Sequence, residues 1–325
     1  MKKKVYFLTT VFFALFLLAL FLSRAMAQKD YPTRPIDLII PWAAGSVTDL
    51  GSRFFAEKWS EFLGQPFIPI NKVGGGGLIA SKLVANAKAD GYTLLIATSG
   101  TISTSRVLRK DAGFDLDSFR FICQWGKNPL IYLVKADSKW KTMSEFLNDA
   151  KQNPGKLRCA VLIGSTIHYA AEMLSRAAGV KLTFVPFKST PEGLTTLIGG
   201  HVEMVVAPGL GGMRGSPHIR ALAVAEEERL FGYPETPTLK EIGYPVFIET
   251  MLMLCGPKEL SDEVASLLSD AHHKVFVKYE KEIKEKMSKI DIAPRLVDGK
   301  ATAKTLREFE KDFKEWTVQA GIKPE

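Results

Sequence analysis

The stretch that decides the fold is Ile36-Asp37-Leu38-Ile39-Ile40-Pro41-Trp42-Ala43-Ala44-Gly45-Ser46-Val47-Thr48-Asp49. Its first five residues form an apolar run typical of a strand, which ends at Pro41. Apolar residues then recur at helical spacing, and Ser46, three residues before Asp49, predicts the helix start. In open α/β sheets such a loop, followed by the free N–H groups of a helix, favours an anionic ligand. An ordinary strand-to-helix connection is the alternative.

Three further clusters of small and hydroxyl residues follow predicted strands: Thr98–Thr101, Gly164–His168 and Lys188–Pro191. Pro191, with Thr190 before it as the predicted cap, indicates another helix start. Each cluster alone fits plain turn chemistry. Together with the first loop they place hydroxyls at four strand ends, which favours one shared binding site.

Short apolar runs alternate with helical patterns along most of the chain. The predicted strands are residues 36–40, 67–70, 92–97, 119–124, 130–135, 157–162, 182–187, 202–206 and 219–224. This alternation predicts an α/β fold with a parallel or mostly parallel sheet. The C-terminal part differs, since two amphipathic helices, the first capped by Ser261, flank the short strand-like Arg295-Leu296-Val297.

Residues 1–27 have the pattern of an export signal. Lys2, Lys3 and Lys4 precede a long apolar run that ends before Ala25-Met26-Ala27, which predicts cleavage after Ala27. An uncleaved membrane anchor is the alternative, because the apolar run is long enough to span a bilayer. The remaining 298 of the 325 residues are enough for two lobes of ordinary domain size.

The charge balance argues against nucleic-acid binding. Four of the 43 basic residues lie in the export signal, so 39 remain against 35 acidic residues. The lysines of segment 278–289 alternate with glutamates, as on a solvated helix face. No basic stripe interleaved with aromatic residues appears, and a nucleic-acid partner is not expected.

Several kinds of chemistry lack their sequence signatures. The spacing of Cys123, Cys159 and Cys255 fits neither a zinc site nor a redox pair. We expect buried cysteines, and a single disulfide between two of them is the alternative. The histidines show no metal-binding spacing, and no metal or cofactor is expected. Ser165 and His168 suggest a nucleophile and its base, but no Gly-x-Ser-x-Gly elbow or orienting carboxylate accompanies them. The chain is therefore not expected to be an enzyme.

Gly74-Gly75-Gly76-Gly77 invites comparison with nucleotide-binding turns. It lacks the acidic residue of the dinucleotide fingerprint and the Gly-Lys-Ser/Thr of a P-loop. We predict a conformational role instead, in which the glycines permit positive φ angles and a close backbone approach.

In combination, the motifs resemble one family, the extracytoplasmic receptors of tripartite tricarboxylate transporters, also called the Bug family. The motifs that carry the resemblance are Tyr31-Pro32-x-Arg34-Pro35, Pro41-Trp42-x-Ala44-Gly45-x-x-Thr48-Asp49, Gly64-Gln65-Pro66, the turn Gly74–Gly77, Asp90-Gly91-Tyr92-Thr93-Leu94-Leu95, Gly164-Ser165-x-x-His168, Val185-Pro186-Phe187-Lys188 and Pro237-Thr238-x-x-Glu241-x-Gly243-Tyr244-Pro245. They cover essentially the whole chain after the export signal.

The resemblance implies a type II periplasmic-binding-protein fold, with two α/β lobes and a ligand cleft between them. The expected lobes are residues 28–132 with 251–325, and residues 133–250. It also implies a monomeric periplasmic receptor that captures a small carboxylated molecule and delivers it to membrane permease subunits. The expected ligand-binding residues are Trp42, Ala44, Gly45, Ser46, Thr48, Asp49, Ser99, Gly100, Thr101, Gly164, Ser165, Thr166, His168, Lys188, Ser189 and Pro208.

Four residues depart from the family pattern: Ser46, Ser99, Tyr169 and Ser189. They imply a pocket richer in hydroxyls than is usual, so the ligand cannot be copied from a relative. The glycine-rich segment 208–217 is expected to form a mobile rim. A ligand-sensing subunit of a signalling protein, an exported hydrolase using Ser165 and a surface interaction protein are the alternative functions.

Overall fold

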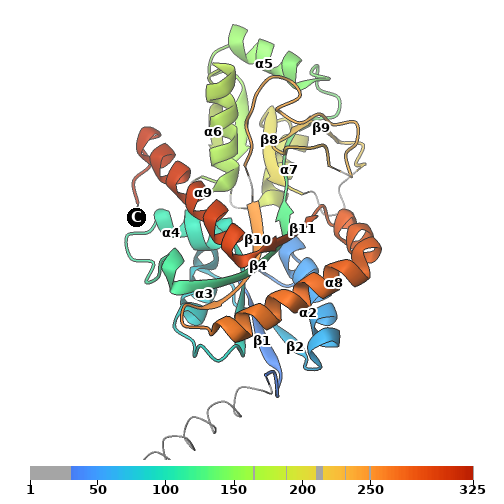
Figure 1. The fold of residues 1–325 in the computed structure, drawn as a ribbon. Helices are drawn as coiled ribbons and strands as arrows, with labels where there is room; N and C mark the ends of the chain where they lie inside the picture. The colour runs from blue at the N-terminus through green and yellow to red at the C-terminus, as the bar shows by residue number, and fades with distance from the viewer. Residues whose placement is uncertain are drawn as a thin grey trace, which may run out of the picture.

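The chain folds around two separate β-sheets, each covered by helices (Figure 1). The computed structural model describes residues 31–163, 165–187, 189–209, 215–230, 232–248 and 250–324. We call the part of the chain around each sheet a lobe. The prediction of an α/β chain with two lobes is confirmed, whereas the predicted residue boundaries of the lobes stay a prediction. The predicted export signal lies outside the described residues.

The first lobe is built on a sheet with the strand order β11-β4-β10-β3-β1-β2. Its strands are β1 (Ile36–Ile40), β2 (Phe67–Asn71), β3 (Thr93–Thr98), β4 (Phe119–Asn128), β10 (Thr250–Pro257) and β11 (Ala293–Asp298). Its helices are α2 (Val47–Leu63), α3 (Leu78–Ala85), α4 (Ser105–Val107) and α8 (Asp262–Lys289). Apolar side chains are buried on both faces of this sheet, because helices cover both.

The second lobe is built on a sheet with the strand order β7-β6-β8-β5-β9. Its strands are β5 (Leu130–Lys135), β6 (Arg158–Val161), β7 (Thr183–Pro186), β8 (Met204–Pro208) and β9 (Ile219–Val224). Its helices are α5 (Met143–Gln152), α6 (Thr166–Ala178) and α7 (Thr190–Ile198). One continuous core fills this lobe.

The prediction of parallel or mostly parallel sheets is wrong. β1 pairs in parallel with β2 and β3, and β6 with β7 and β8. The other neighbouring pairs are antiparallel, with β10 between β3 and β4, β11 beside β4, and β5 between β8 and β9. The reason for the antiparallel pairs of β10 is topological. β4 and β5 carry the chain from the first lobe into the second, and β10 brings it back. β10 therefore runs antiparallel to its neighbours β3 and β4.

Helix α9 (Gly299–Gln319) joins the two cores. Leu306 near its start is buried with residues of the first sheet, whereas Phe313 and Trp316 are buried in the core of the second lobe. In Figure 1 this helix runs from the first lobe along the flank of the second, beside α6. The C-terminal helix therefore spans the junction between the lobes.

The predicted helix starts are mostly confirmed. The side chains of Ser46 and Ser261 accept hydrogen bonds from Asp49 N and Val264 N and cap α2 and α8. The predicted cap Thr190 is wrong, because Ser189 caps α7 by accepting from Glu192 N at 3.4 Å. Ser189 is the residue whose hydroxyl can reach the third backbone N–H of this helix.

All three cysteines are buried and free. Cys123 on β4 belongs to the core on one face of the first sheet and Cys255 on β10 to the core on the other face. The side chains of Cys123 and Cys255 therefore lie on opposite faces of the sheet. A disulfide between them would require one of the two strands to change its register.

Candidate functional site

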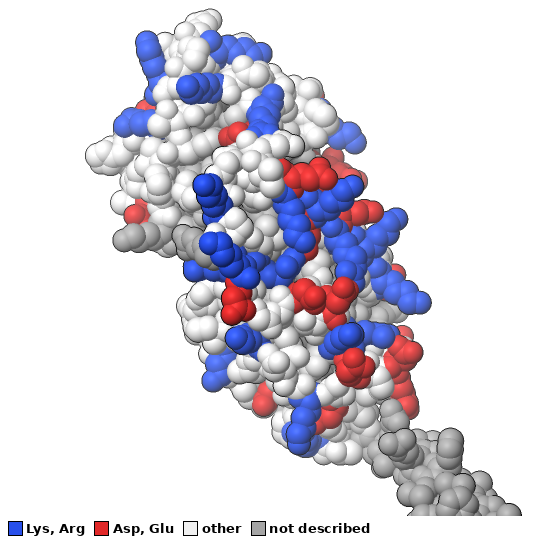
Figure 2. Space-filling view, turned by 90° about the vertical axis from the view of Figure 1, so that its left-hand side faces the viewer, with Lys and Arg blue, Asp and Glu red and all other residues white. Residues whose placement is uncertain are grey.

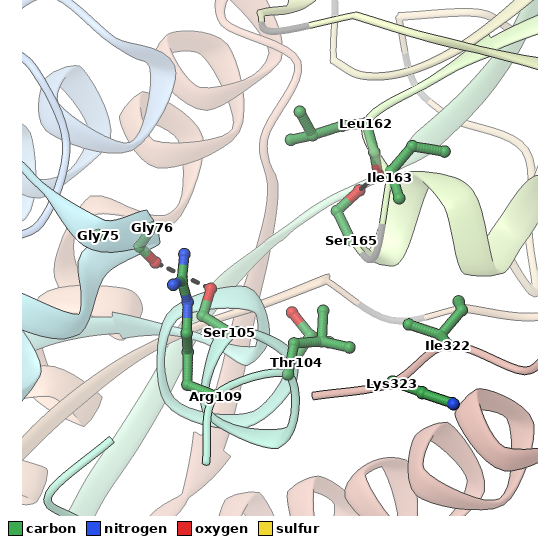
Figure 3. Close-up of a pocket in the computed structure, with 11 residues that line it drawn as sticks. Gly75, Gly76, Thr104, Ser105, Arg109, Leu162, Ile163, Ser165, Ile322 and Lys323 are labelled. Carbon is green, nitrogen blue, oxygen red and sulfur yellow. Dashed lines mark hydrogen bonds between the residues drawn. The ribbon is translucent and has the colours of Figure 1, made fainter. Parts of the chain in front are cut away.

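A cavity of about 270 Å³ lies where the two lobes and the C-terminal segment meet (Figure 3). The residues that line it are Gly75, Gly76, Thr104, Ser105, Leu108, Arg109, Leu162, Ile163, Ser165, Ile322 and Lys323. Three walls can be distinguished: the glycine-rich turn with the segment after β3, the start of α6, and the residues after α9.

The first wall is a close contact between two turns of the first lobe. Gly74, Gly75, Gly76 and Gly77 all have positive φ angles, as predicted for a conformational role. A Cβ on Gly77 would lie 2.3 Å from Thr101 Cγ2, so only glycine lets these turns meet. The Ser105 hydroxyl donates to the Gly76 carbonyl oxygen at 3.0 Å (Figure 3). The backbone of the glycine-rich turn is thereby held at the cavity.

The segment after β3 uses most of its hydroxyls to hold itself together. Thr98 N donates to Thr101 Oγ1 at 3.0 Å, and Thr101 N donates to Thr98 Oγ1 at 3.1 Å. The fully buried Ser99 accepts from Met251 N of β10 at 3.2 Å. Thr104, one turn further, lines the cavity, and its hydroxyl donates to the Gly100 carbonyl oxygen at 3.0 Å.

The second wall is the start of α6. Ser165 caps this helix by accepting from Ile167 N at 3.1 Å and donates to the Leu162 carbonyl oxygen at 2.6 Å (Figure 3). Leu162 and Ile163 add apolar surface to the cavity. Thr166, the first residue of the helix, is buried.

His168 is not among the described residues that line this cavity. Its ring lies edge-on to Phe184 at 5.1 Å and to Trp316 of α9 at 5.2 Å. Burial lowers the pKa of His168 below its usual value, so the ring is held neutral. The Ser165 hydroxyl therefore donates to the Leu162 carbonyl oxygen, whereas the His168 ring packs against the rings of Phe184 and Trp316.

The loop Trp42–Asp49 is organised by Asp49, which is 1% exposed. Its carboxylate accepts from Gly45 N at 2.9 Å, Asn71 Nδ2 at 2.8 Å and Arg53 Nε at 2.9 Å. Burial alone would raise the pKa of Asp49, but the hydrogen bonds from Arg53, Asn71 and Gly45 bring it below its usual value. Asn71 Nδ2 also donates to the Trp42 carbonyl oxygen at 2.8 Å.

This loop lies against the first wall. Pro41 Cβ is 3.3 Å from the position that a Cβ on Gly77 would take. Ala44 and Gly45 are exposed, Trp42 and Ser46 are half-buried, and Thr48 is buried in the first turn of α2. The loop therefore contacts the glycine-rich turn through Pro41, and none of its residues lines the cavity.

Of the predicted site residues that the structure describes, Ser165 is the one that lines the cavity. Gly100 and Thr101 lie in the turn behind the first wall, Ser189 is exposed at the start of α7, and Pro208 is half-buried at the end of β8. Gly164, Lys188 and residues 210–214 of the predicted rim lie outside the described residues. Sequence reasoning missed Ser105, Arg109 and Lys323, and it missed Asn71 and Arg53 as the partners of Asp49.

The chemistry of the cavity suits an anion. Arg109 and Lys323 are cationic, Thr104, Ser105 and Ser165 carry hydroxyls, and none of the described residues that line it is acidic. Acidic and basic side chains are interspersed on the outer face in Figure 2, whereas this cavity has one sign of charge. Such an arrangement attracts a negatively charged small molecule.

The described residues contain no cluster of three or more His, Cys, Asp or Glu side chains that could hold a metal ion. None of their helices combines the length and the apolar character that a membrane span requires.

The chain is similar in sequence and in structure to known periplasmic receptors. Residues 52–317 match the family model described as tripartite tricarboxylate transporter family receptor. A Cupriavidus necator protein, named UPF0065 protein in gbd 5'region, is 32% identical over 92% of this chain and 91% of its own length.

Solved structures agree with this match. The periplasmic binding protein BugD is 26% identical, covers 90% of this chain and 99% of its own, and superimposes with a TM-score of 0.74. An R. palustris protein solved with adipate is 26% identical, covers 91% of this chain and 100% of its own, and has a TM-score of 0.76. The predicted periplasmic-binding-protein fold is thereby confirmed.

Proposed function

Because the chain belongs to the tripartite tricarboxylate transporter receptor family, we propose that its own cavity between the lobes binds a small carboxylated molecule for delivery to a membrane transporter. The family is one of solute-binding receptors, and this function is the basis of the proposal. The observation that carries it is the cavity between Gly76, Ser165 and Lys323, in which none of the described lining residues is acidic.

The lining offers several ways to hold a carboxylate. Arg109 supplies a guanidinium and Lys323 an ammonium. The hydroxyls of Thr104, Ser105 and Ser165 already donate their protons to backbone carbonyl oxygens, so they can hold a carboxylate only by giving up those bonds. A hydrogen bond to a charged acceptor contributes about 1.5–3 kcal/mol, so two or three such bonds give useful affinity. The cavity lies near the lower end of the range of about 300–1,000 Å³ for ligand pockets, which favours a small molecule.

We infer that lobe closure completes the site with the loops predicted from sequence. Ala44 and Gly45 are exposed on the loop whose Pro41 contacts the glycine-rich turn, and Ser165 and Ser189 cap α6 and α7 of the second lobe. Hinge closure around a ligand is the usual motion of two-lobed binding proteins. In this proposal Asp49 positions the loop, since its carboxylate is occupied by Gly45, Asn71 and Arg53.

The partner and the location follow from the same proposal. The protein would be exported, released after Ala27 and would act as a monomer outside the cytoplasmic membrane. Its macromolecular partners would be the permease subunits of a tripartite tricarboxylate transporter. No enzymatic step is required of any residue in the cavity.

Calorimetry with adipate, malate, citrate and hexanoate tests the binding proposal. We expect at least one of these acids to bind the purified protein. Ile163→Trp, which places an indole in the cavity, should abolish that binding, whereas Ile68→Trp on β2, where the native side chain is also partly exposed, should preserve it. Failure of the wild-type protein to bind every acid, or binding that I163W leaves intact, would contradict the proposed site.

A further inference from the structure

The short helical segment that contains α4 has two different faces. Leu108 N donates to the Thr104 carbonyl oxygen at 3.2 Å and Arg109 N to the Arg106 carbonyl oxygen at 3.1 Å, so the segment holds a helical course. Thr104, Ser105, Leu108 and Arg109 line the cavity, and residues four apart share one face of a helix. Arg106 does not line the cavity and pairs with α9 instead. One face therefore carries the cavity wall and another an anchor to α9.

The anchor point on α9 lies between the two lobes. Arg106 Nη2 forms an ion pair with Glu310 Oε1, and the two side chains are 17% and 9% exposed. Along α9, Glu310 stands between Leu306, buried in a core of the first lobe, and Phe313, buried in the core of the second (Figure 1). Phe309 packs against both of these cores. A rotation of one lobe relative to the other therefore acts on α9 close to Glu310.

The ion pair uses only one oxygen of the carboxylate. Glu310 Oε1 contacts Arg106 Nη2 and also accepts from Lys314 Nζ at 2.7 Å. Within the described part of the chain, Glu310 Oε2 and Arg106 Nε are buried and have no hydrogen-bond partner. A guanidinium and a carboxylate commonly pair through two parallel hydrogen bonds, and a buried donor or acceptor without a partner is costly. A shift of α4 against α9 that joins Nε to Oε2 would satisfy both atoms.

We propose that Arg106 and Glu310 are a positioning pair that couples the cavity wall to the orientation of the lobes. The pair makes one contact in the lobe orientation described above and two in the ligand-bound orientation, where Nε also donates to Oε2. A ligand that touches the wall shifts Arg106, and α9 transmits the shift to the second lobe. This coupling goes beyond the proposed receptor function, and only its ligand-dependent part rests on that function.

A distance measurement between the lobes tests the coupling without ligand. Spin labels at Lys88→Cys, after α3, and at Lys151→Cys, on α5, lie on exposed positions of the first and second lobe, and the native cysteines are buried. By electron-electron double resonance we expect Glu310→Gln to broaden the distance distribution by about one half, because a neutral amide no longer anchors the guanidinium. Glu308→Gln removes an exposed carboxylate of the same helix and should keep the wild-type distribution.

Arg106→Lys tests the second hydrogen bond. Lysine keeps the positive charge but cannot form the forked pair, so the ligand-free distribution should stay as in the wild type. With the tightest-binding of adipate, malate, citrate and hexanoate, R106K should show less than about half of the wild-type change in distance and about three- to tenfold weaker binding. Arg307→Lys alters an arginine of α9 that is 51% exposed and should behave as the wild type.

The possible results separate the coupling from the receptor function. An unchanged distribution in E310Q would overturn the coupling between the wall and the lobes. A full ligand-induced change in R106K would overturn the two-bond arrangement. If the wild-type protein binds none of the acids, the receptor function fails, whereas the ligand-free comparison of E310Q with E308Q still decides whether the pair couples the lobes.

Discussion

At the scale of single residues, the buried carboxylate of Asp49 organises the loop Trp42–Asp49. Its carboxylate accepts from Gly45 N, Asn71 Nδ2 and Arg53 Nε, which leaves it little capacity for a solute. Arg53 Nη2 also donates to Asn71 Oδ1 at 2.8 Å, so the donors are linked to one another. The loop is therefore held in shape by hydrogen bonds within the first lobe.

Asp49→Ala should therefore destabilise the protein. We expect the free energy of unfolding in urea at pH 7 to fall by about 2–3 kcal/mol, because buried donors lose their acceptor. Asp137→Ala removes a carboxylate that is 71% exposed and should cost less than about 0.5 kcal/mol. Similar small losses in the two variants would show that the Asp49 network contributes little.

The same network has a pH signature. Since the pKa of Asp49 is lower in the folded than in the unfolded chain, its stabilisation is present above an unfolded pKa of about 3.9 and is lost as pH falls through the folded value. The stability difference between the wild type and D49A should shrink as the pH is lowered below 4.

Residue patterns predicted one of the residues that line the cavity but neither of its cations. Ser165 was predicted as a ligand residue from its place after a strand, and it does line the cavity. Lys323 and Arg109 lie in segments without any local signature, and they reach the same cavity only through the packing of α9 and α4. Gly75 and Gly76 were assigned a conformational role, which is confirmed, but their place on the cavity wall depends on the tertiary contact with Ser105.

At the scale of elements, the sequence predicts strands well where they have a local signature. The run Ile36–Ile40 has the same bounds in the sequence prediction and in β1. β10, which was not predicted, is Thr-Met-Leu-Met-Leu-Cys-Gly-Pro, a fully buried strand without polar alternation or a run of β-branched residues. Strand direction was also predicted wrongly, because it depends on which lobe the chain is leaving or entering.

Helix α8 contains a second buried imidazole that should make stability pH-dependent. Trp59 Nε1 donates to His272 Nδ1 at 3.3 Å, and the rings of Phe55 and Phe276 surround the imidazole. Burial lowers the pKa of His272 to about 4. The unfolded chain takes up a proton below about pH 6.5 while the folded chain does not, so stability is lost between pH 6.5 and 4.

His272→Gln should flatten this part of the stability curve. The expected contribution of His272 to the loss between pH 6.5 and 4 is on the order of 3 kcal/mol, measured as the difference between wild type and variant in urea unfolding. His273→Gln removes the exposed neighbouring imidazole on the same helix and should keep the wild-type slope. A slope unchanged in H272Q would show that the buried imidazole does not govern the acid sensitivity.

At the scale of the whole molecule, the lobes are joined by the passage from β4 to β5, by the return of the chain from β9 to β10, and by α9. Lys127 at the end of β4 forms an ion pair with Glu226, which follows β9, and both side chains are 2% exposed. Lys127 Nζ also lies 5.2 Å from the centre of the Phe247 ring, further along the returning segment. The outgoing and returning connections are therefore linked by buried charges where the lobes meet.

Removing one member of this pair should be costly. Lys127→Met leaves the Glu226 carboxylate buried without its ammonium, and we expect a loss of about 3–5 kcal/mol in the free energy of unfolding. Lys127→Met combined with Glu226→Leu removes both charges and should recover much of that stability, giving a clear coupling in a double-mutant cycle. Lys135→Met breaks the exposed pair with Asp137 and should cost less than about 1 kcal/mol. Additive losses in the double variant would show that the two charges act independently, and the connections would then owe their alignment to the apolar packing around them.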